Sequence, residues 1–135
     1  MRATINGLRI AVIALGCYWV LIFISTHIPA NAITARLHQS DKLVHAVAFA
    51  GLAFLMAWAF PTSISRPFRN VFFASLVGIL YAGMDELLQI PVGRIADWKD
   101  FLADCIGICI GLTIYTTIRN YLIKMRINLL QDPIK

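Results

Sequence analysis

Charged residues are scarce in this 135-residue sequence, at 14% of the chain, whereas hydrophobic residues make up 59%. The chain has only seven carboxylates, and its twelve basic residues are scattered without a basic patch or a nucleic-acid-binding motif. The mean hydropathy of +0.74 is well above that of soluble domains. A soluble domain with a charged surface is therefore excluded. We also expect no nucleic-acid partner, although the net charge is +5.

Cysteine is equally rare. Cys17, Cys105 and Cys109 are odd in number and fall inside apolar segments, which argues against a disulfide framework. Cys105 and Cys109 are spaced by four residues and share a helix face. Two thiols without further soft ligands favour packing over metal binding. A metal site in this chain would have to use oxygen and imidazole ligands.

Four apolar segments approach the roughly 20 residues that a helix needs to cross a bilayer. They are about residues 8–26, 43–60, 71–90 and 101–118. We therefore predict an all-α integral membrane protein of the cell membrane, with one domain over residues 1–135 that forms a bundle of four transmembrane helices. Residues 119–135 either extend the fourth helix or lie on the inner membrane surface.

The basic residues predict the orientation of the bundle. Eight lysines and arginines lie near the chain ends or between the second and third spans, and four lie in the other two connections. Because Lys and Arg are enriched in cytoplasmic loops, both termini are predicted to be cytoplasmic. The first span could instead be a cleaved signal before Ala30-Asn31-Ala32, but its length and its Tyr18 and Trp19 favour a retained helix.

Six of the seven carboxylates fall into three polar clusters at the ends of the spans. The clusters are Asp41, Lys42 and His45; Asp85, Glu86 and Gln89; and Arg94, Asp97, Asp100 and Asp104. The predicted topology places all three at the extracytoplasmic side. Charge in or beside lipid is unfavourable, so this convergence predicts a functional site.

Helical spacing places the acids on faces that also carry small residues. The acids of the third cluster continue at steps of three or four into Gly107 and Gly111, and Asp85 and Gln89 continue a similar stripe through Gly78. Small residues on membrane helices mark packing faces. The acids are therefore predicted to face the interior of the bundle.

The three clusters resemble the motifs of the VanZ-like membrane proteins, a family named for a teicoplanin-resistance protein. The motifs are Asp41-Lys42-x-x-His45, Asp85-Glu86-x-x-Gln89, and Arg94 followed by Asp97 and Asp100, and the resemblance covers about residues 41–111. Asp104 departs from the pattern, because the family usually has asparagine there. The resemblance implies a multi-pass protein with a role near the cell envelope, linked to lipid-linked head groups and antibiotic resistance.

The residue types suggest candidate roles. His45, Asp85 and Glu86 are candidate catalytic residues, because imidazole exchanges protons near neutral pH and carboxylates act as bases or metal ligands. The candidates for substrate binding are Lys42, Gln89 and Arg94. The candidates for a metal-binding or structural role are Asp41, Asp97, Asp100 and Asp104. An oxygen-rich site with one histidine would suit Mg²⁺, Mn²⁺ or Ca²⁺.

Several of these residues also have a structural interpretation. Asp97 can cap the fourth helix, Ser40 or Asp41 can cap the second, and Asp100 can interact with a helix dipole. Arg94 can balance nearby carboxylates, and Trp98 can anchor its helix at the membrane interface.

The sequence thus predicts that the chain binds or processes the head group of a membrane lipid, such as a lipid-linked envelope precursor. The enzymatic form of this hypothesis is metal-dependent hydrolysis or transfer of the head group. One alternative is a noncatalytic binding module that changes the access of amphiphilic antibiotics or lipid precursors. The other is a proton-coupled transporter, which four short spans without an internal repeat make less favourable.

Overall fold

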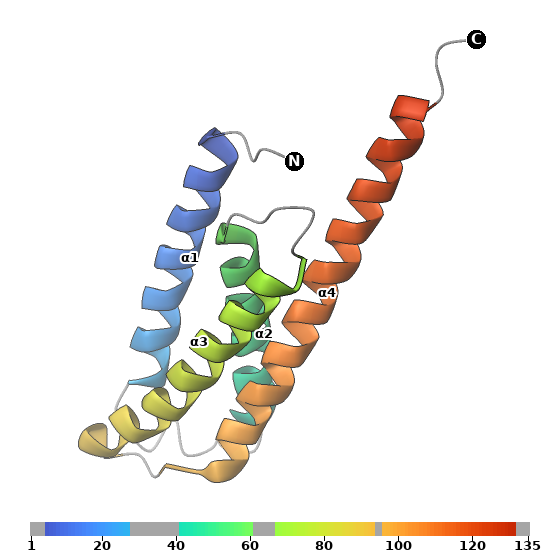
Figure 1. The fold of residues 1–135 in the computed structure, drawn as a ribbon. Helices are drawn as coiled ribbons and strands as arrows, with labels where there is room; N and C mark the ends of the chain where they lie inside the picture. The colour runs from blue at the N-terminus through green and yellow to red at the C-terminus, as the bar shows by residue number, and fades with distance from the viewer. Residues whose placement is uncertain (1–4, 28–40, 61–66, 94–95, 132–135) are drawn as a thin grey trace.

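The computed structural model describes residues 5–27, 41–60, 67–93 and 96–131, and these form four α-helices and one short 3-10 helix. The elements, in chain order, are α1 (Ile5–Thr26), α2 (Asp41–Ala59), α3 (Pro67–Gln89), η3 (Ile90–Val92) and α4 (Trp98–Gln131). The helices lie side by side in a bundle (Figure 1). The predicted all-helical fold is confirmed.

Three of the helices are long and apolar enough to cross a membrane. These are α2, α3 and α4, while α1 contributes a shorter apolar stretch at Ile10–Thr26. The multi-pass character predicted from composition is confirmed. Which end of the bundle faces the cytoplasm stays a prediction.

The fourth helix is much longer than the span predicted at 101–118. Its 34 residues extend for about 51 Å, whereas the hydrocarbon core of a bilayer is about 30 Å thick. Figure 1 shows α4 running well past the other helices toward the C-terminus. The segment that follows the apolar span is therefore an extension of the same helix as far as Gln131.

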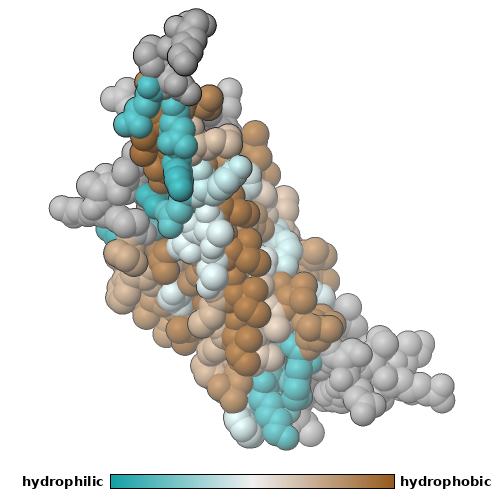
Figure 2. Space-filling model, turned by 90° about the vertical axis from the view of Figure 1, so that its right-hand side faces the viewer, coloured by the Kyte–Doolittle hydropathy of each residue, from teal (hydrophilic) through white to brown (hydrophobic). Residues whose placement is uncertain are grey.

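The outer surface of the bundle has the composition expected of a lipid-facing surface. Large apolar side chains such as Leu80, Ile106 and Ile114 are exposed along the helices. Figure 2 shows hydrophobic residues across the middle of one face and hydrophilic residues toward its two ends. This distribution matches an apolar membrane interior between two polar interfaces.

The closest packing in the bundle lies between α2 and α4. A Cβ atom added at Gly107 would overlap the carbonyl oxygen of Ala46, and one added at Gly111 would overlap that of Ala50. The two helix backbones thus touch where glycine leaves room, as in other small-residue membrane interfaces. The predicted packing face of the fourth span is the interface with α2.

The core on either side of this interface is apolar, with one polar contact at the end opposite the acidic clusters. Phe49, Leu52 and Met56 of α2 are fully buried together with Ile108 of α4. Farther along, Asn70 Nδ2 donates to Tyr115 Oη at 2.9 Å and to the Ala57 carbonyl at 3.1 Å. These bonds satisfy a buried amide and join α2, α3 and α4.

Replacing Gly111 with alanine is expected to lower the free energy of unfolding by about 1–3 kcal/mol, because the added methyl group forces α2 and α4 apart. Thermal unfolding in detergent measures the change. Gly16→Ala is the matched control, because a Cβ at Gly16 meets no described atom within 4 Å. Equal melting temperatures for the two variants would contradict the close packing.

Candidate functional site

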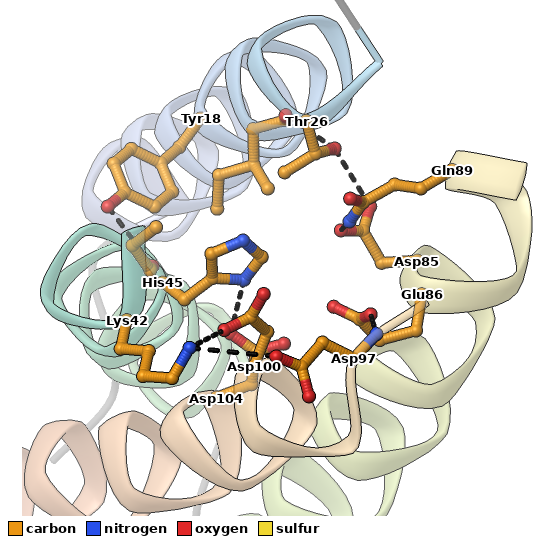
Figure 3. Close-up of polar contacts among 12 residues, drawn as sticks. Tyr18, Thr26, Lys42, His45, Asp85, Glu86, Gln89, Asp97, Asp100 and Asp104 are labelled. Atoms are coloured by element: carbon orange, nitrogen blue, oxygen red, sulfur yellow. Dashed lines mark hydrogen bonds and ion pairs between the residues drawn. The ribbon is translucent and has the colours of Figure 1, made fainter. Parts of the chain in front are cut away.

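The three polar clusters meet at one end of the bundle. This is the end at which α2 and α4 begin and α3 finishes (Figure 1). Six polar residues of the clusters are buried there: His45, Asp85, Glu86, Gln89, Asp100 and Asp104. Figure 3 shows their side chains between the ribbons of α1, α2, α3 and α4. The structure therefore brings together the residues that the sequence predicted to converge.

The deepest contact of the site joins α2 to α4. His45 Nδ1 lies 3.0 Å from Asp104 Oδ1, and the two side chains are 4% and 0% exposed. His45 precedes Ala46 in the sequence, and Asp104 lies one turn before Gly107, so the pair sits beside the close backbone approach of the two helices. Glycine packing is the reason that these side chains can meet.

The start of α4 is held by Asp97 and Glu86. The Asp97 carboxylate accepts the backbone N–H of Lys99 at 2.9 Å, which is the capping role predicted for it. The backbone N–H of Asp97 in turn donates to Glu86 Oε2 at 2.9 Å. Glu86 of α3 thereby fixes the position at which α4 begins.

Lys42 lies at the rim of the site. Its ammonium group is 3.1 Å from Asp100 Oδ1 and 3.7 Å from Asp97 Oδ2, and its side chain is 52% exposed. These contacts tie the first turn of α2 to that of α4. The lysine predicted to bind substrate is thus already paired with carboxylates, and it remains open to the outside.

Asp85 faces a different part of the site, between α3 and α1. Gln89 Nε2 donates to Asp85 Oδ2 at 3.1 Å, and Thr26 Oγ1 donates to Asp85 Oδ1 at 3.0 Å. Thr26 was not among the site residues predicted from the sequence. The available signal was a threonine at the end of the first span, on the same predicted membrane side as the three clusters.

Two candidates cannot be placed. Arg94 and the side chain of Asp41 lie outside the described residues, so their roles stay predictions.

The described residues of the site carry more acidic than basic side chains. The carboxylates of Asp85, Glu86, Asp97, Asp100 and Asp104 outnumber the described lysines near them, Lys42 and Lys99.

The acidic excess determines what the site can bind. Unpaired negative charge in a buried site is unfavourable, so the cluster favours a cation, a proton or hydrogen-bond donors over a bare anion. His45, Glu86 and Asp104 are the residues that could hold a metal ion, because one donor atom of each lies within 4.8 Å of the others. His45 and Glu86 of this group are candidate catalytic residues, and Asp104 is a candidate for a metal-binding or structural role.

Comparison with known proteins gives one finding that bears on this site. The family model described as VanZ/LLP1 matches residues 10–119, from α1 through most of α4. The match includes all the residues of the acidic site and extends beyond the stretch that the three motifs cover. The chain matches no curated protein and no solved structure.

Thr26→Val should weaken the attachment of α1 to α3, because the isosteric side chain cannot donate to Asp85. Hydrogen bonds to charged groups contribute about 1.5–3 kcal/mol, so a loss of stability of that order is expected in thermal or chaotrope-induced unfolding. Thr113→Val serves as control, because the exposed Thr113 hydroxyl donates to Cys109 of its own helix. If both variants unfold alike, Thr26 does not tether α1.

The cap at Asp97 should show a specific pH dependence. The Lys99 backbone N–H and the nearby Lys42 ammonium hold the pKa of Asp97 below its ordinary value. The ionised carboxylate therefore stabilises the fold above the unfolded pKa of about 4, and this contribution is lost as the pH falls through the lower folded value. At pH 7 the wild type is expected to have a higher melting temperature than Asp97→Asn. This difference in melting temperature should become smaller at acidic pH. A difference that grows below pH 4 would contradict this assignment.

Proposed function

The chain belongs to the VanZ/LLP1 family, and we propose that it binds the polar head group of a membrane-embedded amphiphile in the acidic site at one end of its bundle. The observation that carries the proposal is the burial of six polar side chains, four of them carboxylic acids, where three helix ends meet. Such a concentration of ionisable groups needs a purpose other than packing.

The energetics support a functional rather than a structural role. Each buried ion loses several kcal/mol of hydration, and well-packed apolar residues usually replace buried ion pairs without loss of stability. At the opposite end of the bundle, the described residues include one buried amide side chain, Asn70. A bundle of this size is therefore stable without a cluster of acids, and selection for binding explains why the cluster is present.

The position of the site favours a ligand with both polar and apolar parts. His45 lies four residues into α2 and Asp104 six residues into α4, which places them about 6–9 Å from the helix ends. At the same end of the bundle, Val44 of α2, Leu87 of α3 and Trp98 of α4 are exposed apolar side chains. A head group in the site would leave its hydrocarbon chain beside this outer surface, within the bilayer.

The family and the predicted orientation suggest which amphiphile this is. With both termini in the cytoplasm, the site opens to the extracytoplasmic leaflet, where lipid-linked envelope precursors and amphiphilic antibiotics are found. Binding there would change the access of such molecules to the envelope. Chemical conversion of the bound head group is a further step that the experiment below detects.

A proton-coupled transporter is the less favourable alternative. Transport needs a polar route across the membrane, whereas Phe49, Leu52, Met56 and Ile108 fill the interior between the acidic site and Asn70. Within the described part of the chain, the polar groups are thus separated by an apolar core. The binding function requires access from one side only.

The proposed function predicts that one lipid class copurifies with the wild-type protein above its share in the source membrane, and that Asp85→Asn and His45→Ala lose it. Both changes alter the polar groups that contact a head group. Mass spectrometry of lipid extracted from the purified proteins measures the enrichment. Tyr115→Phe is the matched control, because it changes a buried hydroxyl at the opposite end of the bundle.

The variants need to elute and fold like the wild type, as judged by gel filtration and circular dichroism. The same lipid profile in all four folded proteins would contradict the proposal. Release of a product from the enriched lipid by wild type alone would extend binding to catalysis. Ligand-driven proton flux across protein-containing vesicles would instead favour transport.

A further inference from the structure

We propose that His45, Glu86 and Asp104 together bind one divalent metal cation of the Mn²⁺ or Mg²⁺ type. One donor atom from each side chain lies within 4.8 Å of the donor atoms of the other two, and all three residues are buried. The ligands come from α2, α3 and α4 respectively. The site therefore forms only when the three helices pack together.

Two carboxylate oxygens of this group have no hydrogen-bond partner among the residues that the structure describes. They are Oε1 of Glu86 and Oδ2 of Asp104, and both are buried. Figure 3 shows the Glu86 carboxylate turned toward the space between His45 and Asp104. A buried oxygen without a partner is unfavourable, because the hydration lost on folding is not replaced. A cation between the two carboxylates supplies the missing interaction.

The other oxygen of each carboxylate is already held in place. Glu86 Oε2 accepts the backbone N–H of Asp97, and Asp104 Oδ1 lies 3.0 Å from His45 Nδ1. Hydrogen bonds of this kind orient metal ligands before the metal arrives. Donor atoms that share an octahedral ion at about 2.1 Å lie about 3.0–4.2 Å apart, so small side-chain rotations complete the site.

The donor atoms select the kind of cation. Two carboxylates and one imidazole suit a hard or borderline ion, and Mn²⁺ accepts both kinds of ligand. The thiols of Cys105 and Cys109 lie outside this group of donors and are not fully buried. Three protein donors leave other coordination positions of a six-coordinate ion open to oxygen atoms of a ligand.

The role of the ion rests on the proposed function and makes it more specific. The carboxylates by themselves repel an anionic head group, whereas a divalent cation offsets the charge of Glu86 and Asp104 and offers its open coordination positions to phosphate oxygens. Lys42, which is paired with Asp100, lies at the rim of the same site. The head group is therefore of the phosphate-bearing class, a phosphomonoester or a diphosphate.

The ion itself is tested with Mn²⁺ and the full chain in nanodiscs of phosphatidylcholine. Electron paramagnetic resonance of free Mn²⁺ during a titration should show one ion bound per chain. Glu86→Gln and Asp104→Asn should each weaken binding roughly ten-fold or more, as expected for losing a ligand. Tyr115→Phe is the control: it keeps all three ligands and changes a buried hydroxyl at the opposite end of the bundle, so it should bind Mn²⁺ like the wild type.

Spin-echo measurements on the wild type keep the test valid if a ligand variant fails to fold. A nitrogen nucleus coupled directly to the bound Mn²⁺ is expected, because His45 is one of the ligands. Absence of bound Mn²⁺, absence of this coupling, or equal weakening in Tyr115→Phe would each overturn the cation site.

Chelation separates this inference from the proposed function. Purification with a chelator should remove the enriched lipid from the wild type, since the ion links protein and phosphate. Lipid that stays bound after chelation, in a protein shown to bind Mn²⁺, would overturn the linking role and leave the head-group proposal standing. A protein that binds Mn²⁺ but enriches no lipid would overturn the head-group proposal and leave the cation site.

Discussion

The close approach of α2 and α4 is the constraint on which the rest of the structure depends. Gly107 and Gly111 let the α4 backbone touch the carbonyl groups of Ala46 and Ala50. In lipid, where apolar side chains gain little by leaving their surroundings, such direct backbone packing is a main source of helix association. It also sets the distance between neighbouring side chains. His45 and Asp104 meet at 3.0 Å because their helices are this close.

The acidic site is organised around that interface by hydrogen bonds between the helices. Asp97 caps α4 with its carboxylate while its backbone N–H holds Glu86, so the beginning of one helix positions an acidic side chain of another. Thr26 and Gln89 do the same for Asp85 on the side of α1. One carboxylate oxygen of Glu86 and one of Asp104 are thus used to build the site. The other oxygen of each has no hydrogen-bond partner among the described residues.

The sequence predicted the helices well and the contacts within the site less well. The spans and the end of the bundle where the acids gather follow from hydropathy and from steps of three or four residues, because these patterns depend only on local helical geometry. The capping role of Asp97 follows from its place before a helix. The pairing of His45 with Asp104 rather than another acid, and the contact of Thr26 with Asp85, depend on helix rotations and separations that no local pattern records.

By itself, therefore, the sequence determined that this chain forms apolar helices and that its few acids lie near the ends of three of them. Burial of apolar residues and satisfaction of backbone hydrogen bonds within each helix are sufficient reasons, and both act along a single segment. Only the tertiary structure decided which acids share one buried centre and which serve as caps or tethers. The contacts of each acid depend on packing between segments, because the glycine contacts bring particular side chains within reach of one another.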